Sequence, residues 1–115
     1  MSDDELLAHA TEFTFYPTPD PDLEPLADYY HFAFKVAWRG EGRWAVVNGG
    51  SCVGRRGTRS YEPNPSSRTD RFKKAYRFSR DEAVATALKY VEKQTLNGRT
   101  YQEWQRHWVD MGAKP

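Results

Sequence analysis

The sequence predicts an α+β domain in which an antiparallel three- to four-stranded β-meander packs on one helix and is followed by a C-terminal helix. Aromatic and apolar side chains alternate with other residues from Tyr30 to Arg39, the pattern of a half-buried strand with one aromatic face. A capping box at residues 79–82 precedes apolar residues at helical spacing. Four prolines within residues 17–25 exclude a helix or an inner strand there and favour extended chain.

These prolines divide the chain into an acidic, Pro-rich N-terminal arm (residues 1–28) and a single α+β domain (residues 29–115). Ser2 and Glu5 form a capping-box pattern, which predicts a short helix carrying Leu6 and Leu7. The first residues are acidic where a signal peptide would be basic. No apolar run approaches the ~20 residues that a membrane span needs. We therefore expect a soluble protein of the cytoplasm with no membrane partner.

The meander is predicted from residues 30–62. Residues 30–48 indicate a β-hairpin that turns at Gly40-Glu41-Gly42. The turn signal Asn48-Gly49-Gly50 leads into a third strand at residues 51–53. A further strand at residues 59–62 is ended by two prolines. Residues 69–78 are open to two interpretations, a strand ending at Phe78 or, as we favour, a short helix over residues 69–75 followed by an extended piece.

Two helices complete the predicted domain. The first spans residues 80–96, and we expect Asn97-Gly98 to end it. A second capping box, Thr100 with Glu103, begins the C-terminal helix, which we expect to stop near Gly112. One face of that helix carries Tyr101, Trp104, Trp108 and Met111.

Charge is sorted along the chain although the net charge is only +1. Residues 1–34 contain eight acidic side chains and no Lys or Arg, whereas residues 35–80 contain twelve basic side chains and three acidic ones. Residues 81–115 contain five of each sign. A solvated surface usually mixes its signs, so this arrangement indicates a basic face that meets something acidic. The acidic element is a nucleic acid, an acidic protein or the chain's own N-terminal arm.

Cations and rings interleave in residues 35–80, and phosphate binding needs cations while exposed bases stack on rings. The candidate binding residues are Arg39, Arg43, Trp44, Arg55, Arg56, Arg59, Tyr61, Arg68 and Arg71. Lys73, Lys74 and Arg77 lie in the same basic stretch. The alternative is that the rings form the core and the arginines solvate its rim. The overall pI of 7.9 counts against a dedicated nucleic-acid binder.

The sequence contains no pattern typical of catalysis or metal binding. Cys52 is the only cysteine, and His9, His31 and His107 are scattered, with no metal-ligand spacing among them. A lone cysteine on a strand is usually a small buried hydrophobe. We therefore expect no enzyme activity, no catalytic residue, no metal and no cofactor.

Several short blocks resemble small uncharacterised accessory proteins of actinobacterial phages (mycobacteriophage-like hypothetical proteins). The resemblance covers roughly residues 34–105 and leaves out the arm. The blocks are residues 43–46 (RWAV), 61–68 (YEPNPSSR), 77–83 (RFSRDEA) and 97–100 (NGRT) with Glu103. The resemblance implies a phage-encoded, non-structural protein that acts in the host cytoplasm, and it supplies no activity or site residue.

The interpretation that these observations favour is a non-enzymatic phage accessory protein that binds a host protein, as an interaction or inhibitory module. The alternative is a nucleic-acid-binding protein that uses the basic aromatic hairpin of residues 35–80. The sequence leaves the oligomeric state open.

Overall fold

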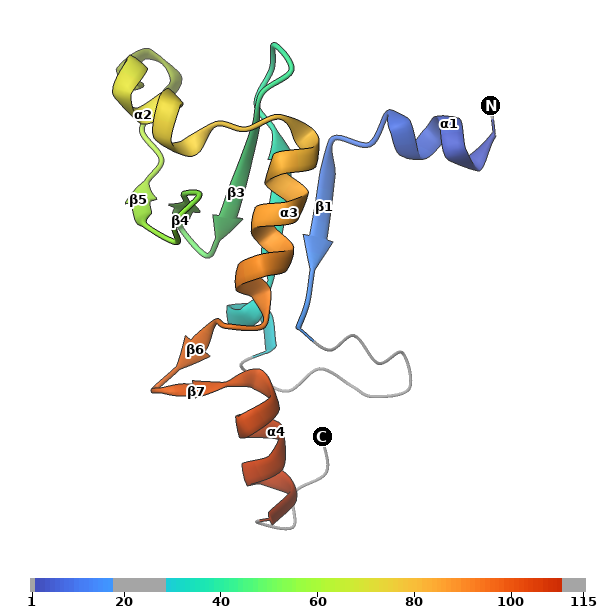
Figure 1. Cartoon of the computed structure of the whole chain (residues 1–115), viewed down its shortest axis with the longest axis vertical. Coiled ribbons are helices and arrows are strands. Elements are labelled where there is room, and N and C mark those ends of the chain that lie inside the picture. The colour runs from blue at the N-terminus through green and yellow to red at the C-terminus, as the bar shows by residue number, and fades with distance from the viewer. Residues whose placement is uncertain (1, 18–28, 111–115) are drawn as a thin grey trace.

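The computed structural model describes residues 2–17 and 29–110. Within these residues, five strands form one antiparallel sheet in the order β1-β2-β3-β4-β5, and α3 crosses one face of it (Figure 1). The strands are β1 (Glu12–Phe15), β2 (Phe34–Trp38), β3 (Trp44–Asn48), β4 (Ser51–Val53) and β5 (Arg59–Tyr61). The helices are α1 (Asp3–Ala8), α2 (Asp70–Tyr76), α3 (Arg80–Val91) and α4 (Tyr101–Asp110). The predicted α+β class is confirmed, with β2–β5 as the meander.

The central hairpin forms where the alternating pattern predicts it. Trp38 pairs with Trp44 across the β2–β3 hairpin, and the turn between them has positive φ at Gly40, Glu41 and Gly42. Strand β2 is shorter than the alternating sequence pattern, which begins at Tyr30, because Tyr29–Phe32 forms a 3-10 turn instead. One side of the hairpin faces α3 and the other carries Arg39.

Strand β1 extends the sheet beyond the predicted meander. Residues 12–15, which the sequence pattern places in the arm, pair with β2 so that Phe13 lies opposite Val36. Phe13 and Phe15 pack against the main core. The proline-rich part of the arm, residues 18–28, lies outside the described residues.

The core fills the space between the sheet and α3. It consists of Phe34, Val36, Trp44, Val46, Val53, Phe78, Ala83, Ala87 and Val91. The small side chains of α3 let the helix approach the aromatic face of the sheet closely. Each large apolar side chain buried there contributes roughly 1.5–3 kcal/mol. The helix begins at the predicted capping box, because Ser79 accepts a hydrogen bond from the Glu82 backbone N–H and Glu82 accepts one in return.

Helix α2 settles the alternative at residues 69–78 in favour of a helix. Its N-cap is Thr69, whose side chain accepts a hydrogen bond from the backbone N–H of Phe72. The chain then becomes extended, and Phe78 forms a β-bridge with Trp44. This bridge ties α2 to the end of the sheet at which the β2–β3 turn lies.

The prediction that Asn97-Gly98 ends a helix over residues 80–96 is wrong. Helix α3 ends at Val91, and Asn97-Gly98 is the two-residue turn of a small hairpin formed by β6 (Thr95–Leu96) and β7 (Arg99–Thr100). Both turn residues have positive φ, 51° and 80°, which Asn and Gly tolerate best. Helix α4 follows β7 directly and begins at the predicted Thr100–Glu103 capping box. Its predicted end near Gly112 lies outside the described residues.

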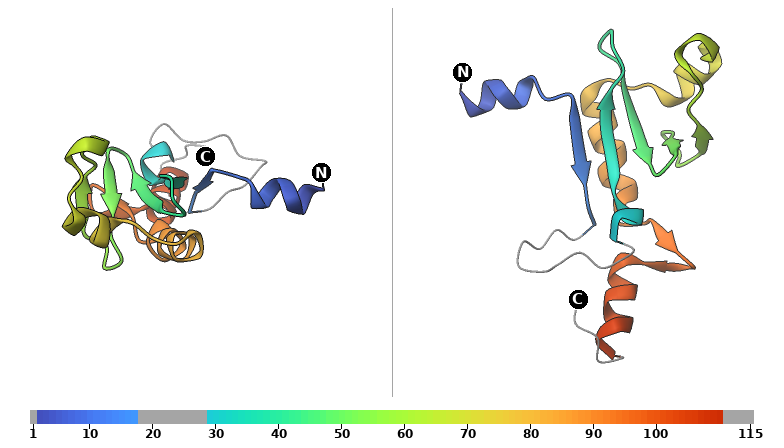
Figure 2. Two further views of the ribbon diagram at one scale, coloured as in Figure 1. Left: turned by 90° about the horizontal axis from the view of Figure 1, so that it is seen from above. Right: turned by 180° about the vertical axis from the view of Figure 1, so that it is seen from behind.

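Helix α1 projects away from the sheet, at the side opposite α2 (Figure 2). It begins at the predicted Ser2 cap and buries none of its residues. Arg80 donates a hydrogen bond to the carbonyl oxygen of Ala8 at 3.2 Å, at the point where the helix joins the sheet. The acidic side chains of α1 therefore lie far from the basic side chains of α2 (Figure 2).

Candidate functional site

Four charged residues form a tight cluster at the end of the sheet near the β2–β3 turn. Arg39 follows β2, and Glu62 follows β5. Arg39 donates two parallel hydrogen bonds to Glu62, from Nε to Oε1 at 2.8 Å and from Nη2 to Oε2 at 3.0 Å. This bidentate geometry is the most specific form of an arginine–carboxylate pair. It fixes both side chains against the sheet face that α3 does not cover.

Two further arginines meet the same carboxylate. Arg77, at the C-cap of α2, donates from Nη2 to Oε1 of Glu62 at 2.6 Å, and its side chain is only 4% exposed. Arg68 places its Nη2 3.2 Å from the same oxygen, and its Nε donates to the carbonyl oxygen of Pro63. Three guanidinium groups therefore share one carboxylate, and the cluster retains two positive charges in excess.

The cluster changes the proton affinity of its members. Hydrogen bonding to Arg39, supported by the charges of Arg39 and Arg77, lowers the pKa of Glu62 from 4.5 to about 2. The same hydrogen bond raises the pKa of Arg39. Glu62 is therefore ionised throughout the neutral range and holds the arginines in place as a fixed negative charge.

A cleft of about 640 Å³ opens above this cluster. Among the residues that the structure describes, six cationic and two acidic ones line it: Arg39, Arg43, Arg68, Lys73, Lys74 and Arg77, with Glu41 and Asp70. Arg43, Lys73 and Lys74 are exposed, and their side chains have no hydrogen-bond or ion-pair partner within the described ranges. The cleft therefore combines arginines held in position with exposed cations that are available to a ligand.

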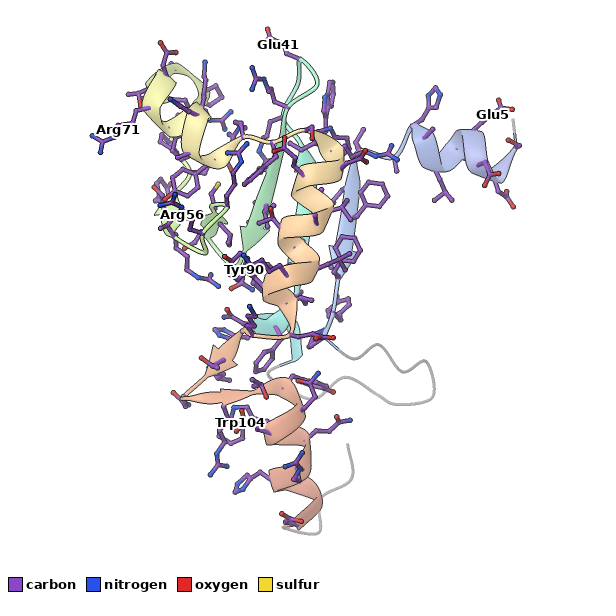
Figure 3. The ribbon with its side chains drawn as sticks, in the orientation of Figure 1. Glu5, Glu41, Arg56, Arg71, Tyr90 and Trp104 are labelled. Atoms are coloured by element: carbon purple, nitrogen blue, oxygen red, sulfur yellow. The ribbon has the colours of Figure 1, made fainter. Side chains whose placement is uncertain are left out.

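The structure brings together three of the nine predicted binding residues. Arg39, Arg43 and Arg68 line the cleft. Arg56 and Arg71 are exposed and do not line the cleft, and Figure 3 shows Arg71 pointing away from α2. Tyr61 is 79% exposed and immediately precedes Glu62.

The other three predicted residues have structural contacts. Trp44 is 8% exposed and belongs to the core. Arg55 donates to the carbonyl oxygens of Lys74 and Arg77 and lies 3.5 Å from Glu82, so it links the β4–β5 turn to α2 and α3. Arg59 donates to Asn48 and Gln94. The sequence predicted a strand at Trp44 but did not indicate which side of the sheet α3 would cover, so it did not show that this ring would be buried.

The predicted set left out four residues that build the cleft: Glu62, Lys73, Lys74 and Arg77. Glu62 has a sequence signal, because it is an isolated acid between a strand and a proline in a strongly basic segment. Arg77 has none of its own, since its burial depends on how α2 folds back onto the sheet.

Cys52 lies under this cluster, on the neighbouring strand β4. It is 1% exposed, and burial raises the pKa of its thiol. The thiolate is the nucleophilic form, so this environment disfavours covalent chemistry at Cys52. Within residues 2–17 and 29–110, no cluster of His, Cys, Asp or Glu has the geometry of a metal site. In the same described part of the chain, every helix is too short or too polar to span a bilayer.

No family model, curated protein or solved structure matches this chain.

Proposed function

We propose that this chain is a non-enzymatic phage accessory protein that acts in the host cytoplasm by binding an acidic surface of a host protein. The observation that carries the proposal is the basic cleft, in which three exposed cations without partners among the described residues surround three arginines held by Glu62. Such a concentration of one sign of charge attracts and orients an acidic partner.

Two exposed rings at the ends of strands support a protein partner. Trp38, the last residue of β2, is 49% exposed, and Tyr61, the last residue of β5, is 79% exposed. Because successive strand residues point to opposite faces, both rings lie on the other side of the sheet from the neighbouring Arg39 and Glu62. Aromatic side chains and arginines are the residues that most often dominate binding energy at protein interfaces. The cleft then supplies charge complementarity, and the rings supply apolar contact area.

The test is a tagged pull-down from an actinobacterial lysate, with a nuclease-treated half and an untreated half. The wild-type chain is compared with the triple variant Arg43→Ala, Lys73→Ala, Lys74→Ala and with a control, Lys89→Ala plus Lys93→Ala, which removes exposed cations around Tyr90 instead. We expect a discrete host protein that survives nuclease, is retained by the control and is lost with the cleft variant. Retention of the same protein by the cleft variant would contradict the proposal.

Nucleic acid is the second candidate, favoured by the exposed Arg56 and Arg71, which add positive charge outside the cleft. Binding to a polyanion that tracks this surface would fall steeply with salt, because each neutralised phosphate releases a counterion. The discriminating variant is Arg56→Ala plus Arg71→Ala, since Arg55 also holds α2 in place. Recovery that disappears with nuclease and with this variant would favour nucleic acid over a host protein.

A further inference from the structure

The floor of the cleft is the cluster of Arg39, Arg68 and Arg77 with Glu62, and it carries more positive charge than Glu62 neutralises. Glu62 is shared by Arg39, Arg68 and Arg77, so two of the three guanidinium charges lack a carboxylate. Arg77 is almost fully buried, and the side chains of Arg39 and Arg68 are 26% and 17% exposed. Charges screened this little by water act strongly on an anion that enters the cleft.

The donors are also held in position before any ligand arrives. Arg39 is fixed by its bidentate pair, and Arg77 donates its second nitrogen, Nη1, to the carbonyl oxygen of Tyr76. Arg68 is held through Nε and Nη2, and its Nη1 has no partner among the described residues. A group already ordered in this way loses little conformational entropy on binding, which favours affinity.

The exposed cations converge on this floor from different elements. Arg43 comes from the β2–β3 turn, and Lys73 and Lys74 come from α2. The volume of the cleft, about 640 Å³, lies in the range of sites that take a small molecule or one modified side chain. This arrangement is a concave site and differs from a flat basic surface that follows a polymer.

The geometry points to a phosphate monoester dianion as the ligand group, either on a small phosphorylated molecule or on a phosphorylated side chain of a partner. A dianion compensates both excess charges of the floor, whereas a carboxylate compensates one. The Nη1 of Arg68 and the exposed guanidinium of Arg43 are left to donate to the oxygens of a phosphate, and the two lysines add point charges. This inference rests on the proposed function, because it names the chemical group that the cleft would take from a partner.

The experiment is a calorimetric titration of the full chain at neutral pH and fixed ionic strength. The ligands are inorganic phosphate, a phosphoserine peptide, the same peptide unphosphorylated, and a peptide with glutamate at that position. We expect the phosphoserine peptide to bind about tenfold more tightly than the glutamate peptide, and the unphosphorylated peptide not to bind measurably. If inorganic phosphate binds as tightly as the peptide, the source is a free small molecule. Preference for the peptide identifies a modified side chain.

Matched variants locate the site. Lys73→Gln plus Lys74→Gln should weaken phosphate binding about tenfold, whereas Lys89→Gln plus Lys93→Gln should change it less than about twofold. Equal weakening by both pairs would overturn the inference, because it would show attraction to diffuse positive charge. Equal affinity for the glutamate and phosphoserine peptides would also overturn it, yet it would leave binding to an acidic protein intact, so the two proposals fail separately.

Discussion

At the residue scale, one carboxylate determines where three arginines lie. Without Glu62, the guanidinium groups of Arg39, Arg68 and Arg77 would repel one another in a partly buried space. With it, they form a positively charged floor that a ligand can approach. The same ion cluster covers Cys52 on the sheet face that α3 leaves open, so Glu62 acts on both stability and the candidate site.

Replacing Glu62 with Gln should destabilise the fold by about 2–4 kcal/mol, because a buried guanidinium is left without its counter-charge and the amide nitrogen faces arginine donors. Chemical unfolding followed by tryptophan fluorescence measures the change. The control is Glu12→Gln, which removes an exposed pair with Lys35 at 3.7 Å and should cost less than about 0.5 kcal/mol. Equal losses for the two variants would show that the cluster contributes no more than a surface ion pair.

The lowered pKa of Glu62 also lets us predict how the free energy of unfolding depends on pH. The pKa of Glu62 is lowered from 4.5 to about 2 in the folded chain. Its contribution is therefore fully present above pH 4.5, where the unfolded carboxyl is also ionised, and is lost as the pH falls towards 2. We expect the difference in unfolding free energy between wild type and Glu62→Gln to shrink over that window. A constant difference from pH 6 down to pH 2 would contradict the assignment.

Cys52 provides a separate check on the packing of the open sheet face. Because the side chain is 1% exposed and burial raises the pKa of its thiol, an aromatic disulfide reagent should modify it slowly in the native state. The rate should rise by orders of magnitude in denaturant. Rapid modification of the native chain at neutral pH would show that the cluster above Cys52 opens readily.

At the element scale, two helices begin with a serine N-cap whose side chain accepts a hydrogen bond from the backbone N–H three residues later, and the two differ in what they bury. Ser79 caps α3, which packs Ala83, Ala87 and Val91 into the core, whereas Ser2 caps α1, which buries nothing. A cap stabilises the whole protein only when the helix that it starts is coupled to the core.

Ser79→Ala should therefore lower the free energy of unfolding by about 1 kcal/mol, the usual value of an N-cap side chain. Ser2→Ala removes the same interaction from α1, and the global unfolding transition should not move. Thermal unfolding of the two variants side by side makes the comparison. A comparable loss from Ser2→Ala would mean that α1 is coupled to the core.

Elements with their own local signals could be predicted from the sequence, and those defined by distant contacts could not. The β2–β3 hairpin and the starts of α1, α3 and α4 follow from alternation and capping residues. Strand β1 was not predicted, because its four residues form a strand only through their pairing with the distant β2. The β6–β7 hairpin was missed because Asn97-Gly98 is a signal both for a helix end and for a hairpin turn. The cleft was only partly predicted, since local patterns do not show where Arg77 becomes buried.

At the scale of the whole molecule, the sorted charge becomes a spatial separation. The acidic helix α1 and the basic helix α2 lie at opposite sides of a molecule that measures 49 Å by 38 Å by 20 Å (Figure 2). Exposed charges interact weakly beyond about 8 Å at physiological ionic strength. The described acidic residues of the arm therefore leave the cleft of their own chain uncovered.

Deleting residues 2–9 tests this arrangement, because it removes Asp3, Asp4 and Glu5 and leaves the sheet and the cleft in place. We expect the affinity for inorganic phosphate to change less than about twofold at 0.15 M salt, where screening is strong. The melting temperature should also stay nearly constant, since α1 buries no side chain. The measurement is the same calorimetric titration, with Lys73→Gln plus Lys74→Gln as the variant that must weaken binding. Tighter phosphate binding by the truncated chain would show instead that the N-terminal acids compete for the cleft, which would make the arm a built-in inhibitor of the site.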